Sequence, residues 1–207
     1  MSGADDGLRE RLVSSEVLHR GRVLELRIDT IETLDGHRST REIAGHPGGV
    51  AIVAIDPEGA VLLVRQWRHA AGRALLEIPA GTLDRDADGR VEDHAEAARR
   101  ELEEETGCRA GTWRHLGSFY TAPGFTNELM QLYLATDLVP ADQDRLGPDE
   151  DERLELERLP FDMAVAMADR GEFEDAKTIV GLLRVDGQLG LPPSAGSGGA
   201  RRARARR

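Results

Sequence analysis

From Gly81 to Cys108 the chain reads GTLDRDADGRVEDHAEAARRELEEETGC, and this segment indicates more about the protein than any other. Its second half, residues 92–106, predicts a helix, because apolar side chains recur there at spacings of three and four residues. These apolar residues are Ala95, Ala98 and Leu102. Gly107 predicts the end of the helix, since glycine readily adopts the left-handed backbone conformation that caps a helix.

Three glutamates, Glu101, Glu104 and Glu105, fall together on the opposite side of the expected helix. Like charges at this spacing repel one another and weaken a helix. One interpretation is a hydrated acidic surface, which is what most glutamate-rich helices present to solvent. The other is a metal site, because carboxylate oxygens on a rigid helix are the ligands that Mg2+ and Mn2+ prefer.

The order of residues in this segment resembles the signature of the Nudix hydrolases. That signature reads Gly, five residues, Glu, seven residues, Arg-Glu-aliphatic-any-Glu-Glu-any-Gly-aliphatic. The match is complete from Glu92 through Arg100 to Gly107, and the small apolar Cys108 takes the last position. One departure lies upstream, where ten residues instead of five separate Gly81 from Glu92. The additional residues are polar and end in glycine, so they predict a lengthened loop that leaves the helix in place.

Segments on both sides of the signature are similar to those of the ADP-ribose pyrophosphatases within that family. They are residues 66–69, 75–81, 121–128 and 171–178. Pro123 lies sixteen residues after Gly107, which is the spacing of a proline characteristic of this subgroup. The resemblance extends roughly over residues 20–185.

The resemblance implies a hydrolase that splits the pyrophosphate bond of ADP-ribose, giving AMP and ribose 5-phosphate, or that of a related nucleoside diphosphate sugar. Water activated by Mg2+ or Mn2+ would be the nucleophile. The implied metal ligands are the carboxylates of Glu101, Glu104 and Glu105 together with the backbone carbonyl of Ala80.

The base that accepts a proton from water comes, in similar enzymes, from an acidic loop after the signature. Residues 148–152 are the matching place in this chain. Glu150 is the favoured base and Glu152 is the second choice. The alternative is that this acidic loop is simply solvated.

Three other residues of the signature have expected supporting roles. Gly81 allows a turn and a close approach that a side chain would obstruct. Arg100 is expected to orient the neighbouring carboxylates and offset their repulsion, in preference to contacting the substrate. Glu92 completes the motif.

Three polar side chains are candidates for binding the substrate. Arg68 is placed to meet a phosphate, and Arg41 is placed to contact the phosphate or the adenine across a dimer. Glu128 would accept hydrogen bonds from ribose hydroxyls. Trp67 and Trp113 are able to stack on a base, but burial by packing is the favoured interpretation for both.

Composition and charge exclude several classes of protein. Of the 207 residues, 40% are hydrophobic, which is enough for a core. No run reaches the roughly eighteen apolar residues of a membrane span, and the polar N-terminus is unlike a signal peptide, so a cytoplasmic location is expected. The single Cys108 excludes an intramolecular disulfide. The net charge of −11 argues against nucleic acid as a specific partner.

The chain is expected to divide into four parts. Residues 1–12 are a flexible N-terminus, residues 13–46 an accessory antiparallel sheet, residues 47–190 the Nudix hydrolase domain, and residues 191–207 a disordered tail rich in arginine. The favoured interpretation of the tail is a solvated end, and the alternative is an electrostatic tether to RNA or to an acidic partner.

Apolar runs and turn residues predict an α/β fold in which strands and helices occur in mixed order. Strands are expected at residues 23–28, 41–43, 50–55, 61–64, 113–120, 129–136 and 154–156, and helices at residues 92–106, 161–170 and 174–183. This order, like the Nudix resemblance, implies an α/β/α sandwich with a mixed sheet. The accessory strands are too few to be stable alone. Since the subgroup exchanges this sheet between two subunits, a homodimer is expected, in which Arg41 reaches the other subunit's cleft.

Two functions of different classes are open. The first is the metal-dependent hydrolase, and the second is a non-catalytic Nudix-like module that senses ADP-ribose or a related nucleotide. Such sensors typically lose the signature carboxylates, whereas all three are present here, so the hydrolase is favoured. Residues 21–29 contain no aromatic side chain on which adenine would stack, which leaves other nucleoside diphosphate sugars as candidate substrates.

Overall fold

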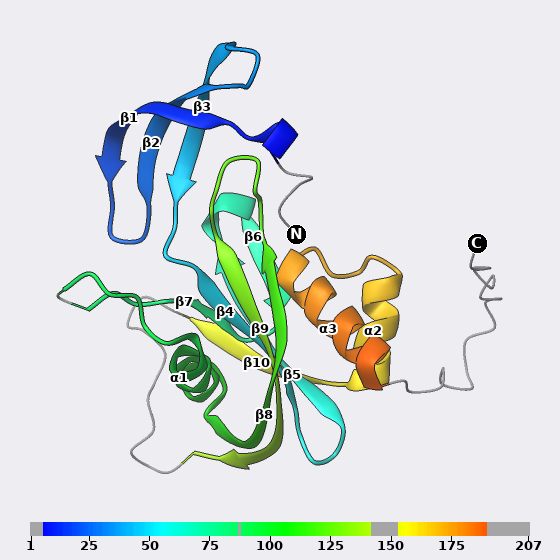
Figure 1. Ribbon diagram of the computed structural model, residues 1–207. Helices are drawn as coiled ribbons and strands as arrows, with labels where there is room; N and C mark the ends of the chain where they lie inside the picture. Colours follow the sequence, from blue (N-terminus) through cyan, green and yellow to red (C-terminus); the bar gives the residue numbers. More distant parts are fainter. Residues whose placement is uncertain (1–5, 87, 142–152, 190–207) are drawn as a thin grey trace, which may run out of the picture.

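The computed structural model describes residues 6–86, 88–141 and 153–189, which form two β-sheets and three α-helices (Figure 1). The helices are α1 (His94–Thr106), α2 (Phe161–Asp169) and α3 (Ala176–Leu189). The smaller sheet, here called the accessory sheet, contains the first three strands, and the larger one, here called the main sheet, contains the other seven.

The main sheet has the strand order β10-β5-β4-β9-β8, with β6 paired to β5 and β7 paired to β4. Its strands are β4 (Gly49–Ile55), β5 (Ala60–Arg68), β6 (Arg73–Glu77), β7 (Ala80–Thr82), β8 (Cys108–Tyr120), β9 (Leu129–Pro140) and β10 (Leu154–Pro160). β4 runs parallel to β9, and the other neighbours are antiparallel, so the sheet is mixed.

Helices cover both faces of the main sheet, with α1 on one face and α2 and α3 on the other (Figure 1). The central strand β4 contributes alternately to the two cores. Val50 and Ile52 pack on the side of α1, whereas Ala51 and Val53 pack on the side of α2 and α3, and all four are fully buried. Burial on both faces explains why this strand reads as a continuous apolar run. The expected α/β/α sandwich with a mixed sheet is confirmed.

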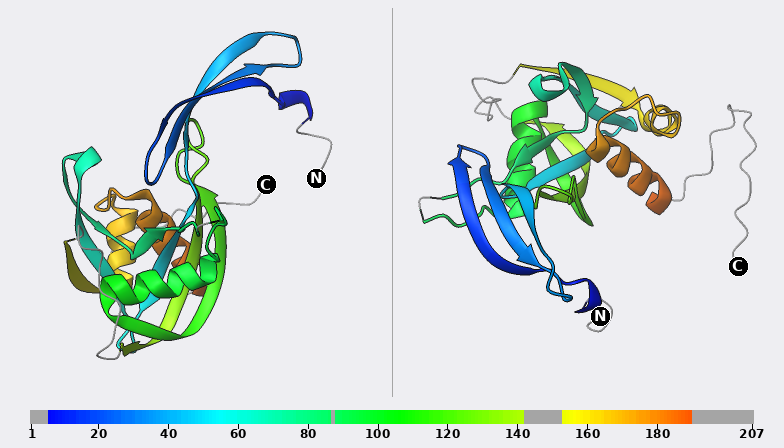
Figure 2. Two further views of the ribbon diagram at one scale, coloured as in Figure 1. Left: turned by 90° about the vertical axis from the view of Figure 1, so that its left-hand side faces the viewer. Right: turned by 90° about the horizontal axis from the view of Figure 1, so that it is seen from above.

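The accessory sheet is antiparallel and projects from the main body (Figure 2). Its strands are β1 (Arg11–Arg20), β2 (Glu25–Glu32) and β3 (Arg38–Gly45). Ala44 connects it to the main body, because its backbone N–H donates to the carbonyl of Phe125 over 2.8 Å. β1 lies mostly within residues 13–46, the expected accessory sheet, but no individual strand was predicted at its position, because every residue of β1 is exposed and no apolar alternation marks it.

The ends of α1 are set by its neighbours in the chain. The side chain of Asp93 accepts hydrogen bonds from the backbone N–H groups of Ala95 and Glu96, so the helix begins at His94 instead of residue 92. Gly107 adopts the left-handed conformation with φ of 67° and ends the helix, as predicted. The short strands β6 and β7 were not predicted, since each has few residues and no clear alternation.

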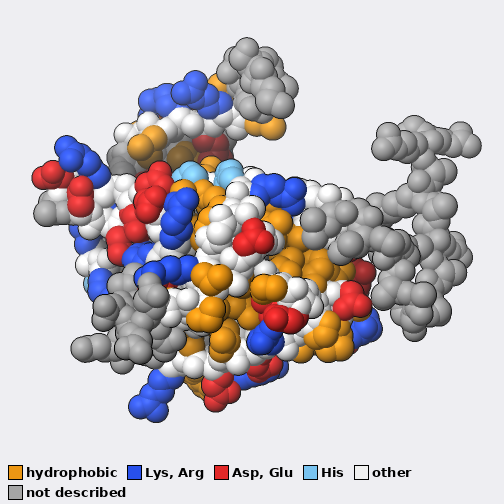
Figure 3. Space-filling view, turned by 90° about the horizontal axis from the view of Figure 1, so that it is seen from below, with side chains coloured by type: hydrophobic (Ala, Val, Ile, Leu, Met, Phe, Trp, Pro, Cys, Tyr) orange, Lys and Arg blue, Asp and Glu red, His pale blue; other side chains and the backbone are white. Residues whose placement is uncertain are grey.

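No helix in the described part of the chain is long and apolar enough to cross a membrane. Figure 3 shows the face that lies opposite the accessory sheet, where acidic, basic and apolar side chains are interspersed.

Candidate active site

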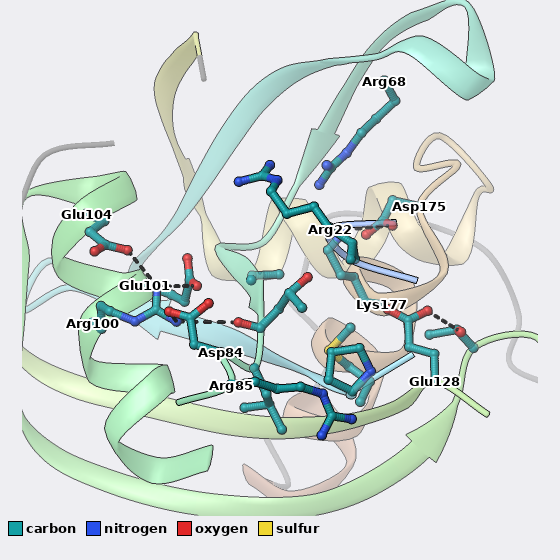
Figure 4. Close-up of a pocket in the computed structure, with 18 of the residues that line it drawn as sticks. Arg22, Arg68, Asp84, Arg85, Arg100, Glu101, Glu104, Glu128, Asp175 and Lys177 are labelled. Carbon is teal, nitrogen blue, oxygen red and sulfur yellow. Dashed lines mark hydrogen bonds and ion pairs between the residues drawn. The ribbon is translucent and has the colours of Figure 1, made fainter. Parts of the chain in front are cut away.

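A cavity of about 860 Å³ lies where the accessory sheet approaches the main sheet (Figure 4). Strand β7 lines one part of it, helix α1 another, and the first residues of α3 a third. Loop residues complete it, among them Arg22 in the β1–β2 turn, Arg85 in the loop before α1 and Glu128 at the end of the β8–β9 loop. Segments that are far apart in the sequence thus meet around one space.

Two carboxylates of α1 pack directly against β7. A Cβ atom on Gly81 would lie 1.9 Å from Cδ of Glu101, so no side chain fits at Gly81 while Glu101 keeps its place. One turn along the helix, Oε2 of Glu105 accepts a hydrogen bond from the backbone N–H of Ala80 over 3.0 Å. The structure therefore brings together Ala80, Gly81, Glu101 and Glu105, four of the residues that the sequence analysis singled out.

Arg100 joins the acidic residues of the signature into one network. Its Nη1 donates to Glu101 over 2.7 Å and to Glu104 over 2.9 Å, and its Nη2 donates to Glu92 over 3.0 Å. Burial by itself lowers the pKa of Arg100, but hydrogen bonding to Glu92 and the charges of Glu101, Glu92 and Glu104 outweigh burial and raise it. A permanently charged guanidinium thus offsets the repulsion between the glutamates, which agrees with the supporting role expected for Arg100.

The same network determines how the glutamates are arranged. Within residues 6–86, 88–141 and 153–189, no three acidic, histidine or cysteine side chains are grouped closely enough to hold one ion. Instead, the guanidinium of Arg100 lies between Glu101 and Glu104 (Figure 4). Glu105 is oriented toward β7 by its bond to Ala80.

The lengthened loop before α1 folds on itself. Asp84 accepts a backbone hydrogen bond from Glu92 over 2.8 Å, and the side chain of Asp86 accepts from the backbone N–H of Arg90 over 2.8 Å. These bonds close the extra residues into a turn, so α1 keeps its position, as the sequence predicted. Arg85, which lies in this loop, lines the cavity.

Glu128 lies in the cavity and is held by its neighbours. Its carboxylate accepts a hydrogen bond from the Thr121 hydroxyl over 2.5 Å and lies 3.7 Å from Nδ1 of His46. The side chain of Asn127 accepts a hydrogen bond from the backbone N–H of His46 over 2.8 Å, which fixes this loop against the end of β3. Pro123, in the same loop, is exposed and does not line the cavity.

The other predicted residues are divided between the cavity and the surface. Arg68 lines the cavity, whereas Arg41 does not and instead pairs with Glu10 beside the accessory sheet. The expectation that Trp67 is buried is wrong, because its side chain is 60% exposed. Trp67 and Arg68 are consecutive in a strand and point to opposite faces, so the orientation that brings Arg68 to the cavity leaves Trp67 outside. Trp113 packs at the edge of the core beside α1, as expected.

Five charged cavity residues were not among the predicted site residues: Arg22, Asp84, Arg85, Asp175 and Lys177. Lys177 donates to Asp175 over 2.9 Å at the start of α3. A signal was present, since residues 171–178 were among the segments that resemble the ADP-ribose pyrophosphatases. The two candidate bases, Glu150 and Glu152, lie outside the described residues.

The fold thus packs an acidic helix on a short strand at the edge of a cavity. Residues 45–181 match the model of the NUDIX domain, and the chain belongs to the Nudix family. Within that family it is an enzyme, a Nudix pyrophosphohydrolase.

Several relatives are similar over most of their length. The ADP-ribose pyrophosphatase of Mycobacterium tuberculosis is 40% identical over 173 residues, which are 84% of this chain and 81% of that protein. The ADP-ribose pyrophosphatase of Bacillus subtilis is 37% identical over 171 residues, or 83% of this chain and 89% of that protein. The methanol dehydrogenase activator of Bacillus methanolicus is 39% identical over 171 residues, which are 83% of this chain and 89% of that protein. A crystal structure of an ADP compounds hydrolase superimposes with a TM-score of 0.74 at 25% identity and covers 88% of this chain and 95% of that one.

Proposed function

We propose that this enzyme hydrolyses the pyrophosphate bond of ADP-ribose, giving AMP and ribose 5-phosphate. The contact between α1 and β7 carries the proposal, because it packs Glu101 on Gly81 and Glu105 on Ala80 beside a cavity that also contains Arg68. Two relatives that are named ADP-ribose pyrophosphatase support the choice of substrate.

Another nucleoside diphosphate sugar would undergo the same chemistry. The GDP-mannose pyrophosphatase of Yersinia enterocolitica is 36% identical over 150 residues, which are 68% of this chain and 74% of that protein. The β1–β2 turn presents Arg22 and Val23 to the cavity, and neither side chain is an aromatic surface for adenine. ADP-ribose is favoured because the relatives named for it are more similar and are matched over more of the chain.

The residues around Gly81 suit a divalent cation. Glu101, Glu104, Glu105 and the carbonyl of Ala80 supply only oxygen atoms, and the space beside Gly81 that a Cβ atom would fill is taken by a carboxylate. Within the described residues no three acidic side chains are grouped closely enough to hold one ion, so these four residues would hold Mg2+ or Mn2+ after their side chains turn toward one another. When bound, such an ion supplies positive charge that offsets the charge of the phosphates and lowers the pKa of water.

The protein's own side chains would divide the remaining tasks. Arg68 binds a phosphate, and Glu128, which Thr121 holds in place, accepts hydrogen bonds from ribose hydroxyls. Arg100 keeps the signature glutamates together without touching the substrate. Glu150 accepts the proton of the attacking water, with Glu152 as the second candidate.

We also propose that the enzyme is a cytoplasmic homodimer. The accessory sheet exposes large apolar side chains, among them Leu12 at 56% and Leu18 at 52%, which a second subunit would cover. Within its own chain Arg41 does not line the cavity, so a contact between Arg41 and the substrate would require the partner's cavity. No specific nucleic-acid partner is proposed, because the chain carries a net charge of −11.

The function is tested by measuring the release of the nucleoside monophosphate (AMP, GMP or UMP) from a panel of nucleoside diphosphate compounds with Mg2+ or with Mn2+. The panel contains ADP-ribose, GDP-mannose, UDP-glucose and NAD+. We expect ADP-ribose to have the highest kcat/KM and to give AMP and ribose 5-phosphate in equal amounts. Binding of ADP-ribose without any turnover would support the non-catalytic sensor instead, and preference for GDP-mannose would replace the proposed substrate.

A further inference from the structure

A buried carboxylate lies behind the cavity and takes no part in the tasks assigned above. The side chain of Glu77, the last residue of β6, is only 1% exposed. Burial raises the pKa of Glu77, but the hydrogen bond from Arg68 and the charge of Lys177 outweigh burial and lower it, so the group is ionised. Burying a charge is costly unless it is fully paired, and the pairing of Glu77 is therefore informative.

Both oxygens of Glu77 face cations that line the cavity. Nε of Arg68 donates to Oε1 over 2.8 Å, and Nη2 of Arg68 donates to Oε2 over 2.7 Å. The ammonium group of Lys177 also donates to Oε2. One buried carboxylate thus holds two cations that come from different elements, β5 and α3.

Lys177 is held from a second side as well. Asp175 accepts a hydrogen bond from its ammonium group over 2.9 Å and another from the backbone N–H of Thr178 over 2.9 Å. The hydroxyl of Thr178 in turn accepts from the backbone N–H of Ile78, next to Glu77 in the chain, over 2.9 Å. The side chain of Lys177 is 11% exposed, so its position is determined by this network.

The geometry leaves one edge of Arg68 for a ligand. A guanidinium has five N–H groups, and the two that Arg68 directs to Glu77 belong to one edge. Those two are the hydrogen bonds that Arg68 makes as a donor to side chains in the described part of the chain. The side chain is 39% exposed, and Figure 4 shows its guanidinium directed into the cavity.

We propose that Glu77 is a positioning residue that holds Arg68 and Lys177 as a pair of cations for the diphosphate of the substrate, and that Lys177 contacts this diphosphate beside Arg68. The inference rests on the proposed function. Two flexible cationic side chains lose conformational entropy when they are ordered on a ligand, and a carboxylate that orders them in the free enzyme removes that loss from binding. Bidentate pairing also fixes the plane of the guanidinium.

The first test is the steady-state kinetics of Glu77→Gln with ADP-ribose. Glutamine has the same shape but no charge, so Arg68 and Lys177 lose their common anchor. We expect KM to rise at least about tenfold while kcat changes less than about threefold, which is the pattern of lost substrate binding. Glu157→Gln is the matched control: Glu157 of β10 pairs over 2.6 Å with Arg65 of β5, the strand that also carries Arg68, and neither Glu157 nor Arg65 lines the cavity. A KM in Glu77→Gln equal to that of the control overturns the proposal.

The second test asks whether Glu77 acts through its partners. We expect Lys177→Gln to raise KM by at least about fivefold, and Lys177→Arg, which keeps the charge, to restore most of the affinity. In an Arg68→Ala background, the effect of Glu77→Gln on KM should be much smaller than in the wild type, because the two residues form one unit. If Glu77→Gln raises KM by the same factor in Arg68→Ala as in the wild type, the two residues act independently, and this result would contradict the positioning role. If Glu77→Gln does not fold, the two Lys177 variants decide: an unchanged KM in Lys177→Gln overturns the proposal.

A third measurement separates this inference from the proposed function. Binding of ADP without metal is measured by titration calorimetry for the wild type, Glu77→Gln and Glu157→Gln. We expect at least about tenfold weaker binding in Glu77→Gln only. If the wild type hydrolyses none of the tested compounds, the proposed function fails, and weaker binding of ADP by Glu77→Gln still supports the positioning role. If the wild type hydrolyses ADP-ribose and both variants bind ADP equally, only the positioning role fails.

Discussion

The carboxylate of Glu101 occupies the space that a side chain at Gly81 would need. A Cβ atom there would lie 1.9 Å from Cδ and from Oε1 of Glu101. Both atoms are at the end of a flexible side chain, and the φ angle of Gly81 is not in the left-handed range. An alanine at this position is therefore compatible with the backbone, and the residue that must move is Glu101.

Gly81→Ala should consequently remain folded but lose activity. We expect kcat to fall by at least about a hundredfold, on the scale of removing one electrostatic stabiliser. The measurements are kcat for ADP-ribose with Mg2+ and Tm by calorimetry. Gly187→Ala is the control, because Gly187 lies in α3 with no atom within 4 Å of its Cβ position, so alanine there should leave kcat unchanged. Normal turnover by Gly81→Ala would show that the place of Glu101 does not matter.

Glu105→Gln should separate charge from structure. The amide oxygen of glutamine still accepts the hydrogen bond from Ala80, so Tm should hardly change. The negative charge is lost, and we expect kcat to fall by at least about a hundredfold. Glu96→Gln, on the exposed face of the same helix, is the control and should retain full activity. Wild-type turnover in Glu105→Gln would exclude Glu105 as a metal ligand.

Replacement of Arg100 should make stability depend on metal. The side chain is 24% exposed and separates Glu101 from Glu104, so Arg100→Ala leaves these carboxylates to repel one another. We expect the free energy of unfolding to fall by about 2 kcal/mol. Millimolar Mn2+ should raise the Tm of Arg100→Ala more than that of the wild type, because a cation that binds the folded state stabilises it. A Tm that is indifferent to Mn2+ in both proteins would count against the metal site.

The pair formed by Asp56 and Arg158 should contribute to acid stability. Burial raises the pKa of Asp56, but the backbone N–H of Ala60 and the charge and hydrogen bond of Arg158 outweigh burial and place it below the ordinary value of 3.8. Its contribution is complete above pH 3.8 and is lost as the pH falls through the lower pKa of the folded state. Asp56→Asn should thus lower Tm at pH 7, and the Tm difference from the wild type should shrink below pH 3.8. A difference that is constant from pH 7 to pH 2.5 would contradict this assignment.

The shared site in the proposed homodimer is tested by mixing two impaired variants. Arg41→Ala and Glu105→Gln should each be weakly active alone. A co-refolded mixture should recover activity, because one of the two sites in a heterodimer combines an intact Arg41 with an intact Glu105. Sedimentation checks the assembly. A monomer at micromolar concentration, or heterodimers without recovered activity, would rule out the shared site.

Local features of the chain were sufficient for α1 and its immediate surroundings. The apolar stripe of that helix, its cap at Gly107 and the loop before Glu92 are all encoded within residues 81–108. The continuous apolar run of β4 likewise predicted a strand that is buried on both faces. These predictions were correct because helix periodicity, glycine conformation and strand burial depend mainly on near neighbours in the sequence.

Contacts between distant segments determined the rest. β1 is exposed along its whole length and is a strand because it pairs with β2, so its sequence has no apolar pattern that predicts a strand. The burial of Glu77 between Arg68 and Lys177 joins residues that are a hundred positions apart, and the exposure of Trp67 follows from the face that Arg68 takes. Periodicity along the chain reports which side of an element is apolar, whereas the packing of one element on another determines which charges meet. The signature therefore indicated the chemistry, and the tertiary structure determined that Arg68 and Lys177 are cations that line the same cavity as the signature glutamates Glu101 and Glu104.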